Sequence, residues 1–158
     1  MASDFEVQVD DAELTRQLSL LSSRLNNMTP VYQVIGETIK TSVAKNFEVG
    51  GRYGAPGSWK GGSNRWKPLS ASTIARKGHN RILFGEGHLM GSINYQADQD
   101  GVVIGTNLVY AAIHNFGGQA GRGRKVKIPP RPYLVIQDVD MAEINAVIND
   151  FLMEGLVA

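Results

Sequence analysis

Hydrophobic residues recur at helical spacing in the first third of the chain. One stripe has intervals of four, three and four residues and consists of Leu14, Leu18, Leu21 and Leu25. A second stripe follows Thr29-Pro30, where proline suits the first position of a helix, and consists of Val31, Val34, Ile35, Ile39, Val43 and Phe47. This spacing predicts two amphipathic helices whose apolar faces belong to the core.

The last part of the chain predicts a third amphipathic helix. Asp140-Met-Ala-Glu143 has the form of a capping box, and Gly155 is a suitable residue to end the helix. Its apolar stripe consists of Ile144, Val147, Ile148, Phe151 and Leu152. Asp10-Asp-Ala-Glu13 has the same capping form, so we expect the first helix to begin there.

Alternation of apolar and polar residues predicts short strands in other segments. Residues 5–9 alternate in this way, and so do residues 125–128, which run into two prolines that would end a strand. Residues 92–95 and 102–104 predict a hairpin, because Asp98-Gln-Asp-Gly101 between them is a good turn sequence.

Short helices and loops are expected between these elements. The helices are predicted at residues 70–77, stopped at Gly78, and at residues 110–114, ending at Gly117-Gly118. An extended glycine-rich loop is predicted at about 48–66 and a basic loop at about 118–127. The fold class is therefore α+β, a single domain over residues 1–158 in which N-terminal and C-terminal amphipathic helices pack with a small antiparallel sheet.

Composition removes several classes of protein. The 158 residues are 42% hydrophobic and fit one domain with one core. No run approaches the ~18 apolar residues of a membrane span, and the acidic N-terminus is unlike a signal peptide. The absence of cysteine excludes disulfide scaffolds and thiolate chemistry. We therefore expect a soluble protein with no membrane partner.

The sequence lacks the patterns of catalytic and cofactor sites. His79, His88 and His114 do not have the spacing of metal ligands, and no serine lies in a G-x-S-x-G sequence. The glycines of residues 117–125 are not followed by the G-K-[ST] of a phosphate-binding loop. We predict that the protein is not an enzyme and uses no cofactor or metal.

Charge is strongly segregated along the chain despite a net charge of +1. Residues 1–13 and 138–158 hold acidic residues and no basic ones, whereas residues 50–91 and 119–132 hold most of the lysines and arginines. If the fold keeps these segments apart, the molecule has two electrostatic faces.

Two basic segments are candidate interaction sites. One interleaves cations with aromatic rings and consists of Arg52, Tyr53, Trp59, Lys60, Arg65 and Trp66. Protein interfaces and nucleic-acid sites both use this composition, and we favour protein contacts. The other consists of Arg122, Arg124, Lys125 and Lys127. These side chains either line a DNA channel, where charge alone suffices, or form a solvated loop or a subunit interface.

Motifs in the middle of the chain resemble those of one known family. They are Trp66-Lys-Pro68-Leu69, Tyr110-Ala-x-x-His114-x-Phe116-Gly117-Gly118 and Ile128-Pro-Pro130-Arg131-Pro132-Tyr133-Leu134. In this order and spacing, from about Trp66 to Leu134, the chain resembles the tailed-phage virion morphogenesis, or tail completion, family. That family is similar to small head–tail joining and tail-terminator proteins.

The resemblance implies a structural virion protein of the phage neck. Such a protein would complete or terminate the tail and join it to the head connector, as a homo-oligomeric ring, expected to be a hexamer, around the DNA channel. The implied partners are further copies of itself, tail tube or tail-terminator proteins, head–tail connector proteins, and genome DNA that passes without sequence recognition. The implied location is the neck or tail end of the virion, and the host cytoplasm during assembly.

The motif residues are expected to be mainly structural. They are Trp66, Pro68, Leu69, Tyr110, His114, Phe116, Gly117, Pro130, Arg131, Pro132 and Tyr133. Among them, Tyr110, His114 and Phe116 are expected to form a packed corner, and the prolines to hold an extended path before the last helix.

Two assembly states remain open at this point. In a closed ring, subunits meet through two different patches, and an acidic terminal helix facing a basic loop of the next subunit would steer that contact. The alternative is a free nucleic-acid-binding protein, a monomer or dimer that uses the basic aromatic middle segment. Its DNA affinity would fall steeply with salt.

Overall fold

The computed structural model describes residues 11–52, 65–154 and 156. This part of the chain contains helices and short antiparallel strands, which confirms the expected α+β class. The elements are α1 (Ala12–Leu25), α2 (Thr29–Val49), α3 (Ala71–Lys77), α4 (His88–Gly91), β1 (Asn94–Ala97), β2 (Val102–Gly105), α5 (Ala111–Phe116), β3 (Gly118–Ala120), a 3-10 turn η1 (Arg122–Arg124), β4 (Val126–Ile128) and α6 (Asp138–Met153). The predicted strand at residues 5–9 and the predicted helix end at Gly155 lie outside the described residues.

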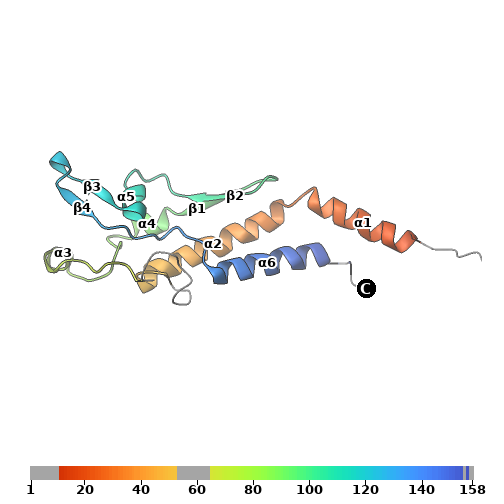
Figure 1. The fold of residues 1–158 in the computed structure, drawn as a ribbon, viewed down its shortest axis with the longest axis horizontal. Coiled ribbons are helices and arrows are strands. Elements are labelled where there is room, and N and C mark those ends of the chain that lie inside the picture. The colour runs from red at the N-terminus through yellow and green to blue at the C-terminus, as the bar shows by residue number, and fades with distance from the viewer. Residues whose placement is uncertain (1–10, 53–64, 155, 157–158) are drawn as a thin grey trace, which may run out of the picture.

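Helix α2 is the central helix, against which the other main elements pack (Figure 1). The β1–β2 hairpin covers one side of it, and α6 lies antiparallel along another. The predicted apolar stripe of α2 is confirmed as core at Val31, Ile35, Ile39, Val43 and Phe47, which are all buried. Val34, at the edge of that stripe, is exposed.

The β1–β2 hairpin approaches α2 closely at Gly36. The strands pair antiparallel, with Asn94 opposite Gly105, as the sequence predicts for a hairpin. The ring of Tyr95 lies against the helix where residue 36 has no side chain, and a Cβ there would be 2.8 Å from Cε2 of that ring and nearer still to two other ring atoms. Glycine at this position therefore sets the distance between helix and hairpin.

Replacing Gly36 with alanine is expected to destabilise the fold, although alanine is the better helix former by about 1 kcal/mol. The clash includes Cγ of Tyr95, which rotation of the ring about its own axis does not move, so we expect a net loss of about 1–3 kcal/mol in the free energy of unfolding. Urea unfolding followed by circular dichroism measures it. In a Tyr95→Ala background the same substitution should stabilise instead; a loss of equal size in both backgrounds would contradict the close approach.

An aromatic cluster joins the end of α2 to the extended segment before α6. The ring of Phe47 lies 5.7 Å from that of Trp66 and 5.1 Å from that of Tyr133, between ring centroids. Trp66 Nε1 donates to the carbonyl oxygen of Pro132 at 3.0 Å, and the Tyr133 hydroxyl donates to that of Ala111. Trp66 and Tyr133 are therefore core residues of the subunit.

A buried polar network fixes the start of α6 against α2. The carboxylate of Asp140 accepts from the Ser42 hydroxyl at 2.9 Å and from the backbone N–H of Gln137 at 2.7 Å. Gln137 Nε2 donates to Asn46 Oδ1, and Asn46 Nδ2 donates to the carbonyl of Tyr133. All four side chains of this network are almost completely buried.

The predicted capping box of the last helix is wrong in its register. Helix α6 begins at Asp138 with Gln137 as its N-cap, and Asp140 occupies the third helical position, where its carboxylate closes a capping box with Gln137. The contact between Asp140 and Ser42 selects this register, because it turns the carboxylate toward α2. Local sequence alone does not contain that tertiary contact.

The prediction that the first leucine stripe belongs to the core is also wrong. No residue of α1 is buried, and Leu14, Leu18 and Leu25 are each more than half exposed. The turn at residues 26–28 directs α1 away from α2 (Figure 1). Its N-cap is Asp11, without a side-chain capping bond, while Asp10 lies outside the described residues.

Helix α1 is tied to α6 near its C-terminal end. The Arg24 guanidinium donates to the carbonyl oxygen of Phe151, lies over the Phe151 ring and forms an ion pair with Glu154 at 3.4 Å. The outer turns of α1 project beyond this anchor (Figure 1).

Candidate functional site

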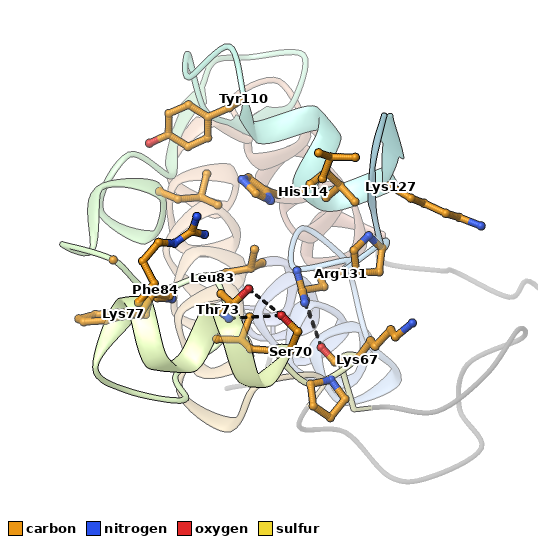
Figure 2. Close-up of a pocket in the computed structure, with 18 of the residues that line it drawn as sticks. Lys67, Ser70, Thr73, Lys77, Leu83, Phe84, Tyr110, His114, Lys127 and Arg131 are labelled. Atoms are coloured by element: carbon orange, nitrogen blue, oxygen red, sulfur yellow. Dashed lines mark hydrogen bonds between the residues drawn. The ribbon is translucent and has the colours of Figure 1, made fainter. Parts of the chain in front are cut away.

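A cleft of about 1020 Å³ opens between α3 and the β3–β4 hairpin (Figure 2). These elements lie at the end of the molecule away from α1 (Figure 1). This α3–β4 cleft is at the upper end of the size range of ligand pockets. Its apolar lining comes from Leu69, Leu83, Phe84, Leu89, Val126, Ile128 and Pro129. Its positively charged lining comes from Lys67, Arg76, Lys77, Lys127 and Arg131.

The cleft is strongly one-sided in charge. Among its described lining residues the single carboxylate is that of Glu86, which lies 2.7 Å from Nε2 of His88. Figure 2 shows Arg131 and His114 near the middle of the cleft, while Lys77 and Lys127 extend outward at opposite sides. The arrangement suits an occupant that has an apolar surface and carries negative charge.

Local sequence builds the α3 wall as predicted. Ser70 caps α3 by accepting from the backbone N–H of Thr73, and Gly78 ends it in the left-handed conformation with φ 75°. The Lys77 ammonium then donates to the carbonyl of Arg81 at 3.0 Å, which closes the loop after the helix. In the same wall Leu83 has φ 52°, an uncommon backbone conformation for a bulky residue.

Hydrogen bonds of Arg131 connect segments that line the cleft. Its guanidinium donates twice to the carbonyl of Lys67, at 3.1 and 3.3 Å, and its backbone N–H donates to the carbonyl of His114. Burial lowers the pKa of Arg131, and burial together with the Arg131 charge lowers the pKa values of His114 and Lys77. The positive charge of Arg131 therefore adds to burial in disfavouring the protonated forms of His114 and Lys77.

The segment predicted as a basic loop at 118–127 is a β-hairpin. Strand β3 pairs antiparallel with β4, with Gly118 opposite Ile128, and Arg122, Arg124 and Lys125 are exposed around its turn. At Gly117, with φ 75°, a Cβ would lie 2.8 Å from the nitrogen of Pro130, so glycine is required for the chain to enter the hairpin. The sequence predicts β4, but β3 has no alternation to reveal it.

The model of the phage virion morphogenesis family matches residues 9–153. The chain belongs to this family. The match confirms the resemblance seen in the motifs and extends it over α1, α2 and α6.

Two relatives are similar over nearly their whole length. The chain is 38% identical over 147 residues to Mu-like prophage FluMu G protein 2 of Haemophilus influenzae, covering 92% of this chain and 94% of the relative. It is 31% identical over 153 residues to putative capsid assembly protein G of Escherichia phage Mu, covering 91% of each. No solved structure gives a significant match.

This member of the virion morphogenesis family buries part of its predicted interface. Arg52 and Trp66 lie inside the subunit, and exposed Arg65 donates to the carbonyl of Val49 beside an antiparallel bridge to Gly51. Tyr53, Trp59 and Lys60 lie outside the described residues.

The residues of the family motifs differ in their exposure and in their contacts. Tyr110 and His114 meet edge to face at 5.9 Å, but Phe116 is 78% exposed, so the predicted packed corner is wrong in including it. Phe116 is the last residue of α5, and the chain leaves the helix at Gly117 directly after it. Pro68 and Leu69 line the cleft, whereas Pro130 is exposed and Pro132 half-buried.

Sequence reasoning missed Asn115, within the same family motif. Its side-chain oxygen accepts from the backbone N–H groups of both Tyr133 and Leu134, at 3.1 and 3.2 Å. It therefore docks the extended segment onto α5. No local sequence pattern predicts that an asparagine will be buried. The buried network of Ser42, Asn46 and Gln137 could not be predicted for the same reason.

Neither a membrane span nor a metal site is evident in the described part of the chain. No helix within residues 11–52 and 65–154 combines the length and apolar character needed to cross a bilayer. In the same residues, His, Asp and Glu side chains do not gather in threes as a metal ion would require.

Proposed function

We propose that this protein is a structural component of the phage neck that completes or terminates the tail and joins it to the head connector. It acts as a homo-oligomeric ring around the DNA channel. Membership in the virion morphogenesis family supports a role in building the virion. The name of the phage Mu relative, a putative capsid assembly protein, is in keeping with such a role.

The observation that carries the ring is the opposite charge of the two ends of the subunit. The α3–β4 cleft and the β3–β4 hairpin, with their cations, lie at one end of the long axis, and α1 and the end of α6 lie at the other (Figure 1). The exposed carboxylates of Asp150 and Glu154, in the last turn and at the C-cap of α6, lie toward that second end. A closed ring needs two different, complementary patches on each subunit, and the contrast in charge between the two ends supports such a pair of patches.

The turn of the β3–β4 hairpin supports a second part of the proposal. Arg122, Arg124 and Lys125 are exposed there, and residues 117–132 contain no acidic residue. In a ring these side chains face the lumen and contact the phosphates of passing DNA without reading its sequence.

The proposed ring is tested by measuring the native mass of the purified chain, first alone and then mixed with purified tails. We expect a defined ring on tail ends. The triple variant Arg122→Ala, Arg124→Ala and Lys125→Ala should form the same ring but retain or eject DNA several-fold less efficiently. The double variant Lys40→Ala and Lys45→Ala, on α2, is the control. A chain that ignores tails and binds duplex DNA by itself would favour the free nucleic-acid-binding protein instead.

A further inference from the structure

We propose that the α3–β4 cleft of one subunit binds residues 4–10 of a second copy of this chain, so that neighbouring subunits are joined by exchanged N-terminal arms. The inference names the partner at the cleft and rests on the ring assembly proposed above.

The chemistry of the segment matches that of the cleft. In the sequence Asp4-Phe-Glu-Val-Gln-Val-Asp10, three apolar residues alternate with polar or acidic ones. In an extended chain, Phe5, Val7 and Val9 point to one side, and the three carboxylates to the other. The apolar side fits the lining of the cleft, and the acidic side meets the cations at its edges. DNA would use those cations but has no need of the apolar lining.

Strand β4 offers main-chain hydrogen bonds to such a segment. The β3–β4 sheet has two strands, and the cleft is lined by β4 residues Val126, Lys127 and Ile128 but by none of β3. The edge of β4 that faces the cleft has no strand partner among the described residues. An extended segment that adds to this edge pairs its backbone while side-chain contacts set its register.

The occupant belongs to another copy because the arm cannot reach its own cleft. The cleft lies near the C-terminal end of α2, since Phe47 packs on Trp66, next to the lining residue Lys67. From there α2 and α1 both lead away along the long axis (Figure 1), and their 21 and 14 residues span about 31 and 21 Å. Ten residues reach at most about 36 Å, short of the way back.

The electrostatics of the cleft favour the same occupant. The lowered pKa values of Lys77 and His114 reflect burial and the Arg131 charge without a compensating carboxylate. Carboxylates brought in by a neighbour would stabilise the charged forms of these groups. The exposed leucines of α1, which connects the segment to its own subunit, are then available to the neighbour as well.

Photo-crosslinking of the full chain tests the proposal directly. The chain has no cysteine, so Val7→Cys accepts a single benzophenone label. A mixture of labelled chain and ¹⁵N-chain is irradiated at high concentration and again with purified tails. We expect crosslinks from residue 7 to residues 67–89 or 126–131 of the other copy. The same label at Asp98→Cys, in the β1–β2 turn, is the control. Crosslinks within one chain, or to α6 or the hairpin turn, would overturn the proposal.

Charge exchange provides an independent measurement. Arg76→Glu with Lys127→Glu, and separately Asp4→Lys with Glu6→Lys, should each weaken self-association at least ten-fold, and the four changes together should restore most of it. Circular dichroism melting shows that each variant is folded. Failure of restoration, or protection of the cleft by duplex DNA in place of the arm, contradicts the proposal. Crosslinks to the cleft without rings on tails would support arm exchange and contradict the neck function. Rings on tails with crosslinks outside the cleft would support the neck function and contradict arm exchange.

Discussion

Replacing Asp140 with alanine is expected to lower the free energy of unfolding by about 2–6 kcal/mol, because two buried donors each lose an acceptor at about 1–3 kcal/mol. The donors are the Ser42 hydroxyl and the backbone N–H of Gln137. Asp140 has no exposed surface, so water cannot replace the carboxylate without a rearrangement of α2 and α6. Urea unfolding followed by circular dichroism measures the change.

Two further variants separate this effect from a general effect of helix charge. Both donors bond the same oxygen, Oδ2, so Asp140→Asn can keep both bonds through its carbonyl oxygen and should lose only their strengthening by charge, about 1–3 kcal/mol. Asp138→Ala removes an exposed carboxylate from the same helical turn and should cost about 0.3–1 kcal/mol through the helix dipole. Equal losses for Asp138→Ala and Asp140→Ala would show that the two hydrogen bonds accepted by Asp140 contribute nothing.

Replacing Trp66 with alanine is expected to cost about 3–5 kcal/mol in the free energy of unfolding, the typical cost of truncating a buried tryptophan. The indole is 4% exposed, packs on Phe47 and donates to Pro132. Its loss would leave both a cavity and an unpaired carbonyl at the junction of α2 and the segment before α6. Unfolding is best followed by circular dichroism, since the second tryptophan dominates the remaining fluorescence.

Phe116→Ala is the matched control, since both residues belong to the family motifs. The Phe116 ring is largely exposed, so its removal should change stability by less than about 0.5 kcal/mol. If Trp66→Ala instead unfolded like the unaltered chain but failed to assemble, Trp66 would be an interface residue and the core described here would be wrong.

Local patterns predicted the elements whose formation depends on nearby residues. Ser70 and Gly78 delimit α3, Pro30 lies in the first turn of α2, and the turn at residues 98–101 closes the β1–β2 hairpin, all as expected. In each case a cap, a glycine or a turn residue is enough to determine the backbone.

Features that depend on distant residues were not predictable. The stripe of α1 has the same spacing as that of α2, yet only α2 is buried, because burial depends on where the turn at residues 26–28 sends the helix. Likewise, the register of α6 is selected by Ser42, far away in the sequence. The cleft brings together segments more than forty residues apart, so its composition could not be read from any one of them.

Among the described residues, Arg24 makes the ionic contact between α1 and α6, close to the turn at residues 26–28. Helix α1 can therefore act as a lever that pivots at that turn. Its 14 residues extend about 21 Å from the turn at residues 26–28. A rotation of about 20° at that turn displaces the far end of α1 by about 7 Å while the body of the subunit stays unchanged. In the ring proposed above, subunits linked through such a lever would keep their contacts over a range of spacings, so the diameter of the ring would follow the structure on which it is built.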